Sequence, residues 1–121
     1  MRVLILLAVA IPMTSPSLAD MSQFRTPSGN IGCEYQPDMN QRMYCVRLEP
    51  SAQFIELDAN GARMGIYEGD FWFPDSAPVL AYNTKKDFGL ITCTSLESGL
   101  ECWTRGKGFK ANRAAIELFN Q

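Results

Sequence analysis

The sequence contains no histidine among its 121 residues. This absence excludes His-based catalytic triads, His-ligated metal sites and the side chain that most often moves protons near neutral pH. An excess of basic residues is also missing, since 11 Lys and Arg face 13 Asp and Glu. The net charge of −2 argues against a protein that binds nucleic acid. A hydrophobic content of 46% and the modest length instead indicate a single globular domain.

Long hydrophobic runs are absent except at the N-terminus, where an apolar run over residues 3–13 follows Arg2. A small-x-small sequence ending at Ala19 comes next, which completes the layout of a cleavable secretory signal peptide. The run is about half as long as the roughly 20 residues that span a bilayer. We therefore expect a signal peptide over residues 1–19 and one β-rich domain over residues 20–121. The mature chain is then a product of bacterial export, periplasmic or secreted, with no membrane span.

Four cysteines form two pairs in the sequence, Cys33 with Cys45 and Cys93 with Cys102. Four cysteines allow three pairings, and the local one is favoured because each pair flanks a hairpin-like segment. A Cys₄ zinc site is disfavoured, since its ligands usually come in Cys-x₂₋₄-Cys spacing. A redox motif of the Cys-x-x-Cys type is absent as well. We expect two local structural disulfides, Cys33–Cys45 and Cys93–Cys102, of the kind found in exported proteins.

Strand-like segments recur about every ten residues, with Gly and Pro between them. This spacing predicts a mainly β fold, which is a small antiparallel sheet, a sandwich or a barrel-like domain. The Asn60-Gly61 dipeptide predicts a hairpin between two of the strands. Only residues 111–119 favour a helix, with Asn112 as its N-cap. Ile116 and Phe119 would share one face of this short C-terminal helix and pack it on the sheet.

Several ordered motifs resemble an uncharacterised family of small exported bacterial proteins, defined as a domain of unknown function. The first motif is Thr-Pro-Ser-Gly-Asn-Ile-Gly-Cys over residues 26–33. The second combines Gly-Leu-Glu-Cys at residues 99–102 with Gly-Lys-Gly-Phe at residues 106–109. The resemblance implies an exported β-rich module with local disulfides. It implies no known activity, substrate or catalytic residue.

The function that the sequence favours is a non-catalytic binding or interaction module of the cell envelope. Four basic residues lie within nine positions of an otherwise acidic chain, which suits an envelope protein or an anionic polymer as partner. A solvated face is the alternative reading of such a stretch. The candidate partner-binding residues are Trp103, Arg105, Lys107, Lys110, Arg113, Ser98 and Trp72. No cofactor, metal ion or catalytic set is expected.

Two other functions remain open. Residues 94–95, 98–99 and 103–106 are similar to parts of small periplasmic lysozyme inhibitors, and this resemblance implies that Ser98 and Arg105 would face the carboxylates of a cell-wall hydrolase. A more remote alternative is a small hydrolase that uses a carboxylate pair such as Glu68 and Asp70. The segment over residues 58–61 resembles the start of a calcium loop, but position 69 is Gly instead of the expected acid, so a β-turn is favoured.

Overall fold

Two antiparallel sheets of five strands each build the fold, in a computed structural model that describes residues 22–69 and 77–120. The first sheet contains, in this order, β1 (Gln23–Arg25), β2 (Ile31–Gln36), β3 (Arg42–Arg47), β4 (Gln53–Asp58) and β5 (Gly61–Ile66). The second contains β6 (Thr84–Phe88), β7 (Ile91–Leu96), β8 (Gly99–Thr104), β9 (Lys107–Ala111) and β10 (Ile116–Asn120). Each sheet is a meander, because every strand pairs with its neighbour in the sequence.

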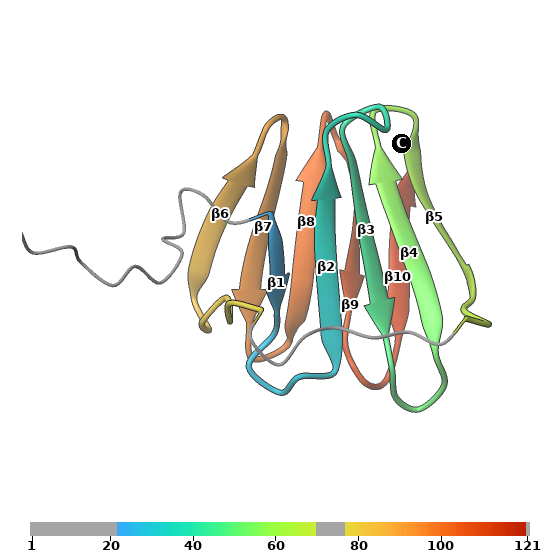
Figure 1. Ribbon diagram of the computed structural model, residues 1–121, viewed down its shortest axis with the longest axis vertical. Coiled ribbons are helices and arrows are strands. Elements are labelled where there is room, and N and C mark those ends of the chain that lie inside the picture. Colours follow the sequence, from blue (N-terminus) through green and yellow to red (C-terminus); the bar gives the residue numbers. More distant parts are fainter. Residues whose placement is uncertain (1–21, 70–76, 121) are drawn as a thin grey trace, which may run out of the picture.

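The two sheets lie face to face as a sandwich, with the strands of both running in similar directions (Figure 1). Alternation along the strands decides which side chains face inward. In β7, for example, Ile91, Cys93 and Ser95 are buried, while the two threonines between them are partly exposed. The largest fully buried side chains come from both halves of the chain: Phe24, Phe109, Met43, Ile55, Leu57, Leu80, Ile91 and Leu100. The predicted mainly β fold is therefore confirmed, in its sandwich form.

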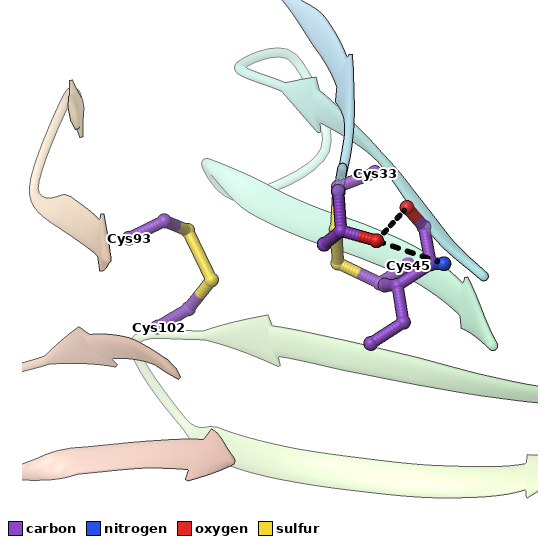
Figure 2. The surroundings of a disulfide bond; sticks show 6 residues. Cys33, Cys45, Cys93 and Cys102 are labelled. Carbon is purple, nitrogen blue, oxygen red and sulfur yellow. Dashed lines mark hydrogen bonds between the residues drawn. A yellow bond between two sulfur atoms is a disulfide. The ribbon is translucent and has the colours of Figure 1, made fainter. Parts of the chain in front are cut away.

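Both predicted disulfides are present and occupy matching places in the two sheets. Cys33 lies directly opposite Cys45 on β2 and β3, and Cys93 lies directly opposite Cys102 on β7 and β8. The Cα atoms of each pair are 4.0 Å apart. Figure 2 shows the two bridges, whose four cysteines are fully buried in the core. Each bridge therefore fixes the register between the second and third strands of its sheet.

At one edge of the sandwich, the Asn120 side chain links the two sheets. The Asn120 amide nitrogen on β10 donates to the Ala62 carbonyl of β5 at 3.0 Å, and its oxygen accepts from the Ala62 N–H at 2.7 Å. The amide thus replaces a strand partner for one residue of the β5 edge. At the other edge, the Phe24 ring of β1 stacks on the Phe88 ring of β6, with 5.5 Å between centroids.

The predicted C-terminal helix is wrong, because residues 116–120 form strand β10 along β9. Asn112 does form the hydrogen bonds of an N-cap, since its Oδ1 accepts from the Ala114 and Ala115 N–H groups. The chain nevertheless continues as a strand, and Asn112 N donates to the Ala115 carbonyl within the connecting turn. The spacing that decides the structure is the two-residue alternation of Ile116 and Leu118, both packed against the core.

The strand prediction also needs smaller corrections. The Asn60-Gly61 hairpin is confirmed, although its two turn residues are Ala59 and Asn60, because Gly61 pairs with Asp58. The segment over residues 79–82 is no full strand and contributes a single bridge, from Val79 to Arg25. No helix able to cross a membrane occurs in residues 22–69 and 77–120, whose regular elements are all strands.

Substitutions in β10 distinguish the strand from the predicted helix. We expect Leu118→Ala to lower the free energy of unfolding by about 1–2 kcal/mol, less than the 2–5 kcal/mol typical of a fully buried leucine. Glu117→Ala, at the exposed position before it, should change that free energy by less than about 0.5 kcal/mol. Urea denaturation followed by circular dichroism measures both. A helix packed through Ile116 and Phe119 would instead make Leu118→Ala neutral.

Candidate functional site

A pocket of about 400 Å³ opens at one end of the sandwich. Its walls are the β1–β2 turn over residues 26–31, the β7–β8 turn over residues 96–100 and the β9–β10 turn over residues 111–114, with Tyr82 beside them. These turns lie at the lower end of the molecule in Figure 1. We call this cavity the large pocket. It is formed by both sheets, so neither half of the chain could form it alone.

The floor of the large pocket is apolar. Ile31, Leu100 and Ala111 line it, and all three are buried at the ends of their strands. Two-residue alternation directs Ile31 to the same side of β2 as Cys33, which follows it by two residues. An apolar group of a ligand would therefore contact side chains that the core already holds in place.

Hydrogen bonds hold the β1–β2 turn in a fixed shape. The Thr26 hydroxyl accepts from the Ile31 N–H and donates to the Ile31 carbonyl, each at 3.3 Å. The Asn30 side chain bonds the backbone N–H and carbonyl of Glu49 in the next turn. The Thr-Pro-Ser-Gly-Asn motif therefore supplies one rigid wall of the pocket.

Asn112 joins the two walls that the second sheet contributes. Its Nδ2 donates to the Ser98 carbonyl at 2.9 Å, and its Oδ1 accepts from the N–H groups of Ala114 and Ala115. Both the nitrogen and the oxygen of this amide are thus bonded within the protein, which makes Asn112 a positioning residue. The Ser98 hydroxyl and the Arg113 guanidinium remain at the exposed rim.

The rim of the large pocket carries one acidic and one basic side chain. Arg113 and Glu97 are exposed lining residues, and neither forms an ion pair with any residue that the structure describes. Arg47 does not line the pocket and is only 4% exposed, but it pairs with the lining residue Ile31 on the neighbouring strand. Its guanidinium donates to the carbonyl of Asn112 and to the Gln53 side chain, and its Nε has no hydrogen-bond partner.

The buried charge of Arg47 has no carboxylate partner among residues 22–69 and 77–120. A buried cation without a counter-charge is costly, and a nearby anion lowers that cost. Because Arg47 bonds the backbone of a pocket residue, it adds to the positive potential at this end of the molecule. At the rim, Arg113 offers a guanidinium to a negative group of a ligand, while Glu97 offers an acceptor.

The structure places two of the predicted binding residues on the outer face of the second sheet. Trp103 stacks on the Phe119 ring, with 5.1 Å between centroids, and its Nε1 donates to Glu101. Lys110 forms an ion pair with Glu101, with 3.8 Å between Nζ and Oε2. The charge of Lys110 is thus balanced locally, and Trp103 is half covered by its neighbours.

The four basic residues of the predicted stretch do not meet in one patch. Arg105 lies in the β8–β9 turn, and Lys107 lies where β9 approaches Gly61 of β5. Ser98 and Arg105 flank β8, whose six residues span roughly 20 Å. They are therefore at opposite ends of the sandwich, whereas Ser98 and Arg113 line the same pocket. Trp72 lies outside the described residues.

Two carboxylates of the first sheet, Glu56 and Asp58, are paired with arginines. Glu56 contacts Arg42 at 3.1 Å and Arg63 at 3.0 Å, and Asp58 contacts Arg63 at 3.2 Å. Burial alone would raise the pKa of the Asp58 carboxyl, but bonds from the Asn60 N–H and from Arg63 hold this pKa below its ordinary value. An ionised, paired carboxylate suits structure better than proton transfer.

The structure does not test the acidic pair and shows the calcium-like segment as a turn. Glu68 is exposed, and Asp70 lies outside the described residues. Asp58 closes the β4–β5 turn by accepting from the Asn60 N–H at 2.8 Å, as expected of a β-turn. Within residues 22–69 and 77–120, no three His, Cys, Asp or Glu side chains gather as metal ligands.

Comparisons of the chain with protein-family models, with curated proteins and with solved structures found no match.

Sequence reasoning named Ser98 and Arg113 but missed the pocket that unites them. The turn at residues 26–30 is recognisable from its Pro and Gly, and the isoleucine after it is recognisable as a strand residue. Nothing in the sequence tells which turns of the two sheets meet at one end, since that depends on the relative direction of the meanders. Arg47 was missed because it occupies a strand position that usually holds an apolar residue.

The lowered pKa of Asp58 predicts a pH-dependent contribution to stability. A carboxyl whose folded pKa lies below its unfolded value stabilises the protein above that unfolded value, which is near 3.8, and loses this effect as the pH falls. We expect Asp58→Asn to lower the free energy of unfolding by about 1 kcal/mol at pH 7 and much less at pH 2.5. Urea titrations at both pH values measure this, with Glu68→Gln as the exposed control. An equal loss at both pH values contradicts the assignment.

Proposed function

We propose that the chain is an exported, non-catalytic binding module of the cell envelope. It binds a segment of an envelope protein in the large pocket, with a carboxylate of that segment against Arg113. The observation that carries the proposal is an unpaired guanidinium at the rim of a pocket with an apolar floor. The volume of about 400 Å³ falls in the usual range of ligand sites.

The chemistry of the pocket favours a peptide over a polysaccharide as ligand. Ile31, Leu100 and Ala111 offer contacts to an apolar side chain, which an anionic polysaccharide lacks. Arg113 offers paired N–H donors to a carboxylate. Glu97 on the facing turn adds an acceptor for an N–H group of the same segment. A peptide that ends in an apolar residue with a free carboxylate has all three features.

Export is part of the same proposal. Two disulfides support it, because such bonds persist mainly in oxidising compartments. The signal-like residues 1–19 lie outside the described part of the chain. The intact mass of the protein recovered outside the cytoplasm tests this part, and a mass that retains residues 1–19 contradicts it.

Inhibition of a cell-wall hydrolase is a second candidate, with a different pair of residues. Ser98 and Arg105 are too far apart to reach one active site together, because β8 separates them. Ser98 and Arg113 lie on one rim and could face a pair of enzyme carboxylates. A lysozyme inhibition assay tests this candidate, and loss of inhibition in Arg113→Glu is the result that supports it.

The direct test is an NMR titration of the labelled mature chain with acetylated tetrapeptides ending in Leu or Val. We expect peptides with a free carboxylate to shift the amide signals of residues 96–100 and 111–114, and the matching peptide amides to bind at least about tenfold more weakly. Arg113→Glu should lose affinity by a similar factor. Lys85→Glu, an equal charge change at an exposed position of β6, should not.

Two results contradict the proposal. One is equal affinity of the parent chain and Arg113→Glu for the carboxylate peptides. The other is the absence of shifts around the pocket with every peptide. Alginate oligomers serve as the polysaccharide probe, and shifts with alginate alone also contradict the proposal.

A further inference from the structure

The two halves of the chain repeat one plan, and the plan relates the two ends of the sandwich. Each half is a five-strand meander with a buried disulfide between its second and third strands. In each half an isoleucine precedes the first cysteine by two residues, Ile31 before Cys33 and Ile91 before Cys93. β2 thus corresponds to β7, and β3 corresponds to β8.

This correspondence predicts a counterpart of the large pocket. The large pocket is formed by the β1–β2, β7–β8 and β9–β10 turns. When each strand is replaced by its counterpart in the other half, these turns correspond to the β6–β7, β2–β3 and β4–β5 turns. All three are found together at the upper end of the molecule in Figure 1.

A second cavity, of about 160 Å³, occupies that place. It is lined at residues 40–41, at residue 59, at residues 90–91 and at residues 104–105, and we call it the small pocket. Ile91 lines it as Ile31 lines the large pocket. The two pockets therefore lie at corresponding ends of one repeated architecture. Their linings differ in part, because Thr104 ends β8 and Arg105 lies in the β8–β9 turn, whose counterpart between β3 and β4 does not line the large pocket.

The backbone around the small pocket is held in an unusual conformation. Asn40, Gln41 and Arg105 have φ angles of 59°, 51° and 53°, in the left-handed region that residues other than glycine seldom adopt. Asn83 is the one other non-glycine residue of this kind in the described part of the chain. Three of the four thus line one cavity. For Arg105 the angle is that of a two-residue hairpin turn, because the next residue, Gly106, has a positive φ of 81° as well.

The small pocket also carries one unpaired positive charge. Arg105 is exposed and forms no ion pair within residues 22–69 and 77–120. The lining contains no carboxylate, since its other polar side chains are Asn40, Gln41 and Thr104. Leu90 and Ile91 provide the apolar surface beside the guanidinium. Both pockets thus combine an isoleucine with an arginine that forms no ion pair among the described residues.

We propose that the small pocket is a second binding site for a peptide carboxylate, so that one chain links two partner segments. The inference rests on the proposed function of the large pocket and extends it to a bivalent module. The smaller volume suits a smaller terminal side chain, such as alanine, in place of leucine or valine. The two bound segments are held at opposite ends of strands that span roughly 20 Å.

Binding at the two ends can be separated by NMR with acetylated tetrapeptides that end in alanine and a free carboxylate. We expect a second set of shifts, at residues 40–41, 90–91 and 104–105. Arg105→Asn removes the charge and keeps a residue that tolerates a positive φ, so it should abolish this set and leave the shifts at the large pocket unchanged. Arg113→Glu should have the reverse effect.

Bivalence is measured by aggregation of beads that carry both the leucine-ended and the alanine-ended peptides. The unaltered chain should cross-link the beads, and either single variant should not, because each retains one site. Cross-linking that persists in Arg105→Asn overturns the second site. Shifts confined to the large pocket also overturn it while leaving the proposed function intact, whereas shifts at neither pocket contradict both.

Discussion

The two buried disulfides are the constraint on which the rest of the structure depends. Each joins directly opposed residues on the second and third strands of its sheet, so neither hairpin can slip by one residue without breaking the bridge. A slip of this size would turn every inward side chain outward. With the register fixed, Ile31 and Ile91 both face the core at the ends of their strands and provide the apolar surface of the two pockets.

Charge is distributed differently on the faces and at the ends of the sandwich. On the outer faces, Arg42, Arg63 and Lys110 each contact a carboxylate. At the ends, Arg105 and Arg113 have no such partner among the described residues. Flat sheet faces bring side chains of neighbouring strands into register, which favours pairing. At the ends, the turns place an arginine with no such partner in the described part of the chain beside apolar surface, so a ligand can contact both.

Local chemistry in the sequence predicted the disulfides, the hairpin at Asn60 and the mainly β fold, because each depends on residues close together in the chain. The helix prediction was wrong because the capping residue Asn112 also suits a turn, and the edge of β9 supplied a strand partner that the sequence does not reveal. The four basic residues of the predicted stretch are close in the sequence but not in space, because Arg105 and Arg113 lie in the turns at opposite ends of β9. The pockets could not be predicted, since each is formed by turns from both sheets.

The central claim is that two similar halves, each fixed by its own bridge, share one core and fold as one unit. Native-state hydrogen exchange of the oxidised protein tests this most directly. The slowest amides should lie in β2, β3, β7 and β8 and should open with nearly equal free energies, because opening either sheet exposes the core of the other. Exchange of all amides of one sheet at a clearly lower free energy than those of the other would contradict the claim.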